Sequence, residues 1–188
     1  MNNRKLCSDC HRVMNACICK LAASFNNTLP VTVLRHPSER KQEKATADLL
    51  RLSLTNCKII DSEIFLPEEV LRPEHRNILI YPSENSTALT NKITTHSNSK
   101  IHIILIDGTW KKAYKIFMSN NFLHNLETLS LNVEKESIYK SIRKQKDNGL
   151  STFEAAAEVL NLLENNFPLE DFDKALEGFL AQLKSFRN

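Results

Sequence analysis

The most informative stretch of the sequence is HIILIDGTW, residues 102–110. After the histidine it is an apolar run with no polar face, as is typical of a central strand in a parallel sheet. Asp107, Gly108, Thr109 and Trp110, the chain's one tryptophan, follow directly. Because ligands bind at the carboxyl ends of the strands in open α/β sheets, this stretch predicts a buried strand that ends in a functional site.

Other short β-like runs alternate with amphipathic helical segments along the chain. The predicted strands lie at about residues 31–34, 58–60, 77–81, 101–106 and 129–131, and the predicted helices at about 39–54, 84–95, 110–119, 151–163 and 172–183. Ser151 and Glu154 have the spacing of a capping box, which marks a helix start. This alternation predicts an α/β domain with a mainly parallel sheet flanked by helices. We place a cysteine knuckle at residues 1–25 and the sheet domain at residues 26–188.

The composition is that of an ordinary soluble globular protein, with 41% hydrophobic residues, 25% charged residues and a net charge of +3. No apolar stretch approaches the ~20 residues of a membrane helix, and the N-terminus lacks the apolar region of a secretory signal. We therefore expect a cytoplasmic protein with no membrane association. Its net charge permits an RNA partner without requiring one.

The chain has only three glycines, Gly108, Gly149 and Gly178, and they are not clustered. A Rossmann dinucleotide fold or a P-loop needs several clustered glycines, because the backbone must approach a pyrophosphate closely. This argues against a nicotinamide dehydrogenase, a P-loop NTPase and an ordinary Rossmann-type methyltransferase.

Four of the five cysteines, Cys7, Cys10, Cys17 and Cys19, lie close together near the N-terminus. In a reducing compartment this crowding favours a metal site over disulfides. The C-x2-C-x6-C-x-C pattern offers four soft thiolates, which suit the tetrahedral coordination of Zn²⁺. The spacing predicts a structural zinc site. Redox-active or incidental thiols are the alternative, and His11 is an alternative ligand.

Polar residues follow three of the predicted strands. HPSE (residues 36–39) follows the first, YPSE (residues 81–84) the third, and DGTW (residues 107–110) the most buried one. Each has an ordinary structural explanation, as a strand end, a turn, a helix cap or a core anchor. Three such ends on one sheet predict a site instead.

Together these motifs resemble the signature of the DTW-domain family, whose Asp-x-Thr-Trp element stands here at residues 107–110. Residues 36–39 with Thr46 resemble the family's first motif, and residues 81–84 resemble the second. The last motif is similar to Tyr139-x-x-x-Arg143-Lys144 followed by Leu150-Ser151-Thr152-x-Glu154-Ala155. The cysteine cluster resembles that of the bacterial tRNA-modifying members, and the likeness runs in order along nearly the whole chain.

The resemblance implies an aminocarboxypropyltransferase grouped with the SPOUT-like enzymes, and leaves open whether this chain is knotted. The implied reaction transfers the 3-amino-3-carboxypropyl group of S-adenosylmethionine to N3 of a tRNA uridine and releases methylthioadenosine. S-adenosylmethionine would be the co-substrate, Zn²⁺ a structural ion and tRNA the partner. No obligate protein partner is evident.

The chemistry assigns roles to particular residues. Uracil N3 is a poor nucleophile until it loses its proton, so a carboxylate beside it would act as general base. Asp107 is the first candidate and Glu39 the second. Predicted cofactor contacts come from Tyr81, Pro82, Ser83, Thr109, Trp110, Ser151, Thr152 and Glu154. Among these, the indole offers a flat face for a base or adenine, and the helix that opens at Ser151 offers amides to the cofactor's carboxylate.

Basic residues gather beside three of the motifs. Arg35, Arg40, Lys41 and Lys44 flank the first, Lys111, Lys112 and Lys115 follow the tryptophan, and Lys140, Arg143, Lys144 and Lys146 lie in the last. Solvated helix faces would have the same charges. Their position beside the motifs predicts a rim that contacts RNA phosphates, with Arg40, Lys111, Lys140, Arg143 and Lys144 as its main members.

Two other functions are compatible with the same residues. A zinc-knuckle RNA-binding protein without catalysis would explain the cysteines and the basic residues, but not a DTW element on a buried strand. A SPOUT-like RNA methyltransferase would keep the cofactor and change the product.

Overall fold

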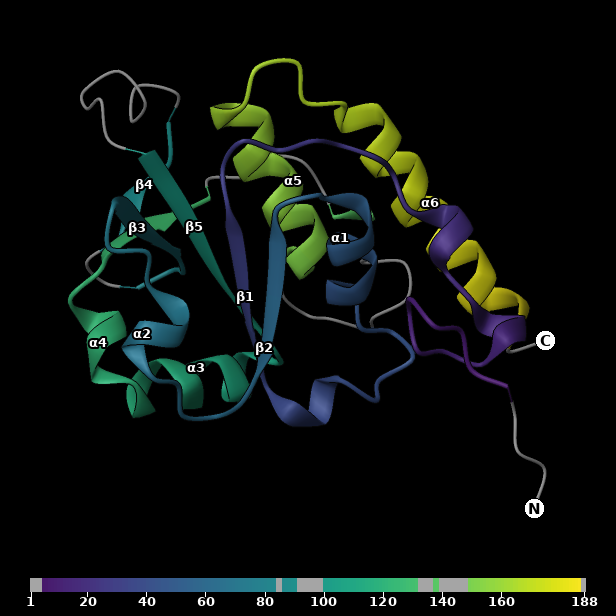
Figure 1. Ribbon diagram of the computed structural model, residues 1–188, viewed down its shortest axis with the longest axis horizontal. Helices are drawn as coiled ribbons and strands as arrows, with labels where there is room; N and C mark the ends of the chain where they lie inside the picture. Colours follow the sequence, from purple (N-terminus) through teal and green to yellow (C-terminus); the bar gives the residue numbers. More distant parts are fainter. Residues whose placement is uncertain (1–4, 84–85, 91–99, 132–136, 139–148, 187–188) are drawn as a thin grey trace.

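The computed structural model describes residues 5–83, 86–90, 100–131, 137–138 and 149–186 (Figure 1). Within these residues the chain forms one sheet of six strands in the order β2-β1-β5-β3-β6-β4, and every pairing is parallel. The strands are β1 (Val31–Arg35), β2 (Cys57–Asp61), β3 (His75–Ile80), β4 (Thr87–Ala88), β5 (Lys100–Asp107) and β6 (Glu127–Ser130). The predicted parallel α/β sheet is confirmed.

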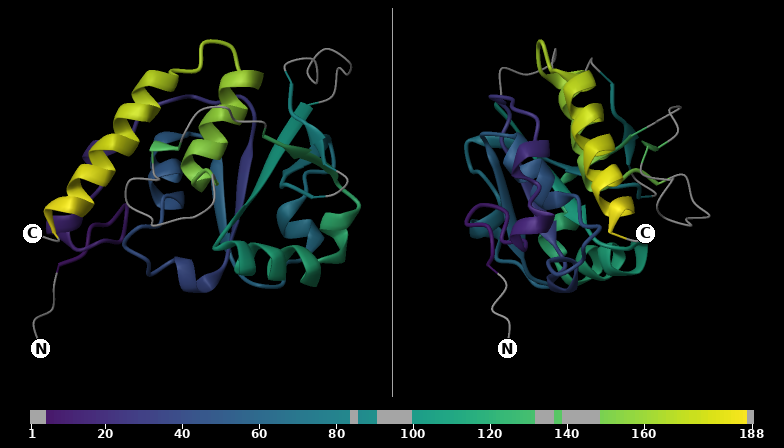
Figure 2. Two further views of the ribbon diagram at one scale, coloured as in Figure 1. Left: turned by 180° about the vertical axis from the view of Figure 1, so that it is seen from behind. Right: turned by 90° about the vertical axis from the view of Figure 1, so that its right-hand side faces the viewer.

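Helices cover both faces of this sheet (Figures 1 and 2). They are α1 (Ala47–Ser53), α2 (Pro67–Val70), α3 (Trp110–Ser119), α4 (Asn121–His124), α5 (Thr152–Leu163) and α6 (Leu169–Ser185), with short 3-10 turns η1 (Met14–Ala16), η2 (Cys19–Leu21) and η3 (Pro37–Glu39). Helices α1, α5 and α6 pack on one face, and α2, α3 and α4 on the other. None of the helices in the described part of the chain combines the length and apolarity needed to cross a membrane.

The two layers explain why residues 103–106 of β5 are all apolar. Side chains alternate along a strand, so Ile103 and Leu105 enter the larger core beneath α1 and α5, whereas Ile104 enters the smaller core beneath α3. All three side chains are buried. Between His102, which is buried with hydrogen-bond partners, and Asp107 at the carboxyl end of the strand, every residue of β5 is apolar.

The predicted helix at residues 39–54 is shorter in the structure. Residues 37–39 form the turn η3, and the α-helix begins only at Ala47. Residues 40–44 are all polar (RKQEK), so they present no apolar stripe that could pack on the sheet as a helix.

The prediction of a helix at residues 84–95 is wrong for residues 86–90, which the structure describes. Thr87 and Ala88 form β4, which pairs in parallel with β6 at Leu129 and Ser130. Leu89 N–H extends the pairing by donating to the Ser130 carbonyl oxygen at 2.8 Å. The edge of β6 supplies backbone hydrogen-bond partners that a helical pattern in the sequence does not reveal. Residues 84–85 and 91–95 lie outside the described part.

The cysteine knuckle packs against the rest of the chain. Cys7, Cys10 and Ile18 are buried and belong to the larger core, together with residues of α1, α5 and α6. A backbone bridge between Leu6 and Val13 closes the first turn of the knuckle. The boundary between residues 25 and 26 stays a prediction.

Candidate active site

The candidate site lies at the carboxyl ends of the neighbouring strands β1 and β5. Their register pairs Arg35 with Asp107, the last residue of each strand. His36 N–H donates to the Asp107 carbonyl oxygen at 3.0 Å, which continues the pairing by one residue. This edge is where ligands bind in open parallel sheets.

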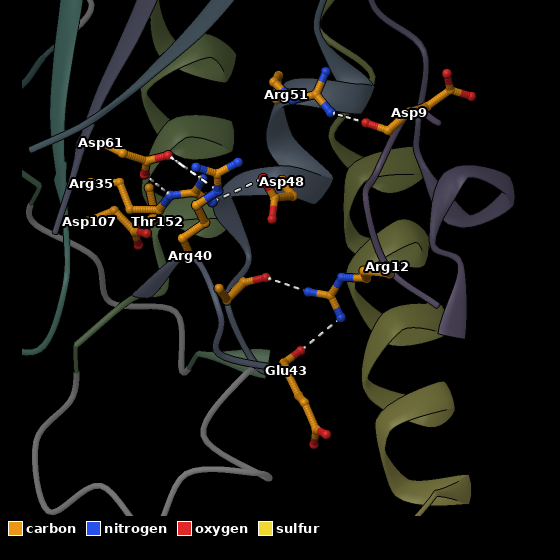
Figure 3. Close-up of polar contacts among 11 residues, drawn as sticks. Asp9, Arg12, Arg35, Arg40, Glu43, Asp48, Arg51, Asp61, Asp107 and Thr152 are labelled. Carbon is orange, nitrogen blue, oxygen red and sulfur yellow. Dashed lines mark hydrogen bonds and ion pairs between the residues drawn. The ribbon is translucent and has the colours of Figure 1, made fainter. Parts of the chain in front are cut away.

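A residue of helix α5 fixes the side chain of Asp107. The alternation along β5 directs its side chain to the α5 face, and the residue is only 8% exposed. The Thr152 hydroxyl, in the first turn of α5, donates to Asp107 Oδ1 at 2.5 Å, and Figure 3 shows the two side chains next to each other. The fold thus joins a predicted base to a predicted cofactor-binding residue 45 positions away.

Arg35 is the neighbour of Asp107 in the sheet, and its predicted place among the RNA-contacting cations is contradicted. Its side chain is buried, and its guanidinium donates to both oxygens of Asp61 (2.6 and 3.1 Å) and to Asp48 Oδ1 (3.0 Å; Figure 3). Burial alone would lower the pKa of Arg35, but the hydrogen bonds and charges of the two carboxylates outweigh it and raise the pKa above its ordinary value. Arg35 is therefore a fixed internal cation.

Glu39, the second candidate base, lies in η3 just after β1 and is buried. Its Oε1 accepts a hydrogen bond from Lys112 Nζ, in the first turn of α3, at 2.7 Å. Helix α3 approaches the end of β5 closely here, because a Cβ on Gly108 would stand 3.1 Å from the Lys112 Cβ. Glu39 thus reaches the same edge of the sheet as Asp107, but in an ion pair with α3.

The first turn of α5 contains the predicted residues Ser151, Thr152 and Glu154. The capping box is confirmed, since Ser151 Oγ accepts from Glu154 N–H (3.3 Å) and Glu154 Oε2 accepts from Ser151 N–H (2.8 Å). Phe153 N–H donates to Thr46 Oγ1 at 3.4 Å. Three amides of this helix end, those of Ser151, Phe153 and Glu154, already have protein acceptors, so a ligand carboxylate could use them only by displacing these acceptors. The cofactor contact at this helix stays a prediction.

Trp110 opens α3 and is 47% exposed, which excludes its alternative role as a core anchor. The indole lies against Gly149, where a Cβ would stand 3.4 Å from the ring carbon Cζ2. A Cβ at position 149 would make ordinary van der Waals contact with the ring. An accessible indole at a strand end offers a flat face on which a nucleobase can stack. Thr109, the residue before it, is exposed at the cap of the helix.

Tyr81 lies on the other face of the sheet from Asp107. Its ring stacks on Phe117 of α3, with 4.8 Å between ring centroids, and it belongs to the smaller core. Pro82 and Ser83 follow it, the first exposed and the second half-buried. The structure does not direct the Tyr81 and Asp107 side chains toward each other, so the predicted cofactor contacts of residues 81–83 stay a prediction.

The structure describes two of the five predicted RNA-contacting residues. The Arg40 side chain is 65% exposed, with its nearest ion pair to Asp61 at 3.9 Å. Arg40 lines a groove of about 890 Å³ between the cysteine knuckle, residues 40–43 and α1. Lys111 is exposed in the first turn of α3. The other three residues, Lys140, Arg143 and Lys144, lie outside the described part of the chain.

The four clustered cysteines form a candidate metal centre. Their sulfur atoms all lie within 4.8 Å of one another, with Cys7 and Cys19 at 3.6 Å and Cys10 and Cys17 at 3.8 Å. A tetrahedral Zn²⁺ with bonds of about 2.3 Å holds its sulfurs roughly 3.8 Å apart, so this geometry fits the ion. Backbone amides of Cys10 and Asp9 lower the pKa of the Cys7 thiol to about 6, whereas burial raises the pKa of Cys19, so Cys7 is the first of the two to become a thiolate.

His11, the alternative ligand, is exposed, and the four sulfurs make up the cluster without it. The four-cysteine set is therefore the arrangement that the structure supports as a possible zinc site.

Sequence reasoning missed the internal ion pairs of Arg35 with Asp48 and Asp61. A signal was present, because Arg35 directly follows the apolar run VTVL and Asp61 directly follows the run KII. Two polar residues that end neighbouring parallel strands meet at one edge of the sheet. Only the observed pairing of β1 with β2 shows that Arg35 and Asp61 end neighbouring strands.

Comparison with known proteins supports the family resemblance that the motifs indicate. The chain is similar to tRNA-uridine aminocarboxypropyltransferase 2 of Drosophila melanogaster, with 32% identity over 182 residues, covering 87% of this chain and 68% of that protein. The proteins of the same name from Macaca fascicularis and Mus musculus are 30% and 29% identical, and the matches cover 95% and 87% of this chain. The chain spans 63% and 58% of the lengths of these two relatives. No solved structure matches the chain.

The relatives are animal proteins, so the resemblance to bacterial members stays a prediction. The model of the DTW domain matches residues 4–188, which include the cysteine cluster, the strand-end motifs and the first turn of α5. With this match over nearly its whole length, the chain belongs to the DTW-domain family.

Proposed function

We propose that this chain transfers the 3-amino-3-carboxypropyl group of S-adenosylmethionine to N3 of a uridine in tRNA. The observation that carries the proposal is the alignment with tRNA-uridine aminocarboxypropyltransferases over 87% to 95% of this chain. The site supports it with a sheltered carboxylate and an accessible indole, both at the end of β5. These are the groups that a uridine substrate needs for deprotonation and stacking.

The reaction is a displacement at carbon. S-adenosylmethionine, when bound, supplies a γ-carbon activated by the sulfonium, with methylthioadenosine as the leaving group. The protein must hold uracil N3 in line with that carbon and take the N3 proton as the N–C bond forms and the C–S bond breaks. Alignment determines whether the γ-carbon or the methyl group reacts, so positioning governs the product.

Asp107 is the proposed general base. Thr152 fixes the orientation of its carboxylate, and Arg35, its neighbour in the sheet register, is a permanent cation near the forming charge. Such a preorganised arrangement stabilises charge without reorganisation during the reaction. Glu39 remains the second candidate.

The proposed substrate contacts surround this carboxylate. Trp110 would stack on the target base or on the adenine, with Thr109 beside it, and the first turn of α5 would receive the cofactor from the other side. Tyr81, Pro82 and Ser83 would close the pocket from the end of β3. The support is their common position at the carboxyl ends of β3, β5 and the first turn of α5.

For RNA, we propose contacts from Arg40 and Lys111 together with the basic segment at residues 140–144. The exposure of the first two residues, which follow Glu39 and Trp110 directly in the chain, supports this role. A structural Zn²⁺ in the cysteine knuckle and a cytoplasmic location complete the proposal. The four-sulfur geometry supports the ion, and the tRNA substrate supports the location.

The SPOUT-like grouping is also a proposal. It is supported by the parallel sheet, in which β5 lies between β1 and β3 although β3 precedes it in the chain.

The decisive experiment incubates the protein with S-adenosylmethionine and unmodified tRNA and identifies both products by mass spectrometry. We expect methylthioadenosine to appear in step with aminocarboxypropyluridine. Release of S-adenosylhomocysteine would support the methyltransferase alternative. Tight tRNA binding with neither product would support an RNA-binding protein without catalysis.

A further inference from the structure

We propose that Arg12 is a positioning residue that connects the cysteine knuckle to the catalytic centre. Arg12 holds the segment between Glu39 and Thr46, and through this segment it places Thr152 against Asp107. The inference deepens the proposed function and rests on it for its catalytic consequence. The structural link itself does not depend on the reaction.

The backbone of Arg12 is fixed by the cysteine knuckle. Cys7 N–H donates to the Arg12 carbonyl oxygen at 2.8 Å, next to the backbone bridge that closes this turn. His11 lies in the left-handed region, with φ of 57°, and turns the chain back after Cys10. Because Cys7 and Cys10 belong to the four-sulfur cluster, the turn that sets Arg12 is the turn that sets the metal ligands.

The Arg12 side chain leaves the knuckle and holds two carbonyl groups of the segment that leads to α1 (Figure 3). Nη1 donates to the Glu43 carbonyl oxygen at 2.9 Å and Nη2 to the Ala45 carbonyl oxygen at 3.2 Å. The guanidinium also lies 5.2 Å from the centroid of the Phe179 ring in α6. A planar guanidinium fixes two acceptors at once, whereas a lysine ammonium on a flexible stem does not.

The held segment has little regular structure of its own. Residues 40–46 form turns between η3 and α1. Their backbone hydrogen bonds join residues close in sequence, such as Ala45 N–H to the Gln42 carbonyl oxygen at 3.0 Å. Glu39 precedes the segment and Thr46 ends it, and both residues are buried. The contacts of Arg12 therefore fall in the middle of the least regular part of the site.

The contacts continue from this segment to the candidate base. Ala45 and Thr46 are buried, and Thr46 Oγ1 accepts from Phe153 N–H at 3.4 Å. Thr152, the preceding residue, donates to Asp107 Oδ1 at 2.5 Å. This row of contacts is a functional coupling only if a change at Arg12 also changes the site at Asp107. Both changes can be measured.

Arg51 provides a matched control. It lies in α1, and its Nη2 donates to the Asp9 carbonyl oxygen at 2.6 Å, so it also connects the knuckle to the sheet domain (Figure 3). Its hydrogen bond goes to the knuckle and not to residues 43–45. Loss of Arg51 therefore weakens the docking of the knuckle without removing the grip on the segment.

The experiment compares the full chain with Arg12→Ala, Arg12→Lys and Arg51→Ala. For each protein it measures zinc content, amide hydrogen exchange of residues 42–50 and 150–156, and steady-state kinetics with S-adenosylmethionine and tRNA. For Arg12→Ala we expect unchanged zinc and exchange of residues 42–46 that is faster by about tenfold, because hydrogen bonds that hold the segment are lost. We expect kcat to fall by roughly 10- to 100-fold, with a change of about threefold or less in the KM for tRNA. Arg12→Lys should lie between Arg12→Ala and the unchanged chain, and Arg51→Ala should stay close to the unchanged chain.

Unchanged exchange of residues 42–46 in Arg12→Ala would overturn the proposal, whatever happens to activity. An equal effect of Arg51→Ala would also overturn it, because general docking of the knuckle would then order the segment. A loss confined to the KM for tRNA would make Arg12 an RNA contact instead. If the unchanged chain makes no aminocarboxypropyl product, the proposed function fails, while the exchange comparison still tests the link from Arg12 to residues 42–46.

Discussion

Arg35 and Asp107 end two neighbouring parallel strands in direct register, so a buried cation and the candidate base stand side by side. Asp61 and Asp48 hold the Arg35 guanidinium, and Thr152 holds the Asp107 carboxylate. The charges at this edge of the sheet are thus fixed before a substrate arrives. Such fixed charge is what catalysis by electrostatic preorganisation requires.

The first prediction concerns the base. Asp107→Asn keeps the shape of the side chain but removes its capacity to take a proton, so turnover should fall by roughly 10²–10⁴-fold. Affinity for tRNA and S-adenosylmethionine should change little. Single-turnover rates and equilibrium binding measure the two effects separately.

Thr152→Val is the companion variant, because it removes the donor to Asp107 and keeps the volume. We expect a smaller loss of turnover than for Asp107→Asn. If Asp107→Asn abolished binding of S-adenosylmethionine, Asp107 would orient that ligand and Glu39 would become the leading base. Normal turnover by a folded Asp107→Asn protein would leave Asp107 without a catalytic role.

The second prediction concerns the metal. Replacing Cys7 and Cys10 with serine should remove about one equivalent of zinc, measured by elemental analysis, since two of four ligands are lost. The melting temperature of the whole domain should also fall, because both residues lie in the larger core.

Cys57→Ser is the control for the metal prediction. Its sulfur is outside the four-sulfur cluster, and burial raises the pKa of this thiol to about 12, so it is a poor ligand. This variant should retain its zinc. Equal zinc content in the two variants would rule out the proposed site.

The third prediction concerns the basic segment, which lies outside the described residues. Changing Lys140, Arg143 and Lys144 together to alanine should weaken tRNA binding and flatten its dependence on salt, because fewer counterions are released. Binding of S-adenosylmethionine should be nearly unchanged. A triple variant of the exposed residues Lys58, Lys174 and Lys184 removes the same charge elsewhere. The same loss of tRNA affinity in both variants would point to net charge and not to a specific surface.

The fourth prediction concerns pH and a histidine in the middle of the sheet. His102 is fully buried, its Nδ1 is 2.7 Å from Asn77 Oδ1, and its Nε2 is 2.8 Å from Thr32 Oγ1. The Asn77 amide nitrogen donates elsewhere, so its oxygen accepts from Nδ1–H. The Thr32 hydroxyl, which can donate or accept, faces Nε2. Burial, followed by the charge of Arg72, lowers the pKa of His102 to about 4.

The sign of the pH effect follows from this lowered pKa. Between the unfolded value of about 6.5 and pH 4, the unfolded chain binds more protons than the folded one. The free energy of unfolding should fall as the pH drops through this window, by up to about 3 kcal/mol for this one residue. Denaturant unfolding at pH 7.5, 6 and 4.5 measures the fall, and His102→Gln should lack this part of it. If the free energy of unfolding falls equally with pH in both proteins, His102 does not cause the fall.

Much of the fold could be predicted because the sequence marks it locally. The apolar run before Asp107 and the amphipathic pattern of residues 110–119 identified β5 and α3 correctly. The capping box at Ser151 placed the start of α5 within one residue. In these elements the local preference and the packing in the fold agree.

The rest depended on contacts that the sequence does not reveal. Thr87 and Ala88 became a strand because β6 offered an open edge, although their neighbourhood reads as a helix. Whether Arg35 contacts solvent or two carboxylates depends on the positions of Asp48 and Asp61, which come from α1 and β2. In the same way, candidate cofactor and catalytic residues could be named from motifs, but the face of the sheet on which each of them lies became known only with the strand order.

The contact between the cysteine knuckle and α6 has a consequence for synthesis of the protein. Gln182 Nε2 donates to the Cys17 carbonyl oxygen at 3.2 Å, across 165 positions of the chain, and Leu21 packs where Gly178 leaves room. At about 5–20 residues per second, the ribosome completes this part of α6 roughly ten to thirty seconds after the cysteines. During that interval the knuckle lacks its contacts with α6. Early capture of zinc would close the knuckle and shield its sulfurs from oxidants until α6 emerges.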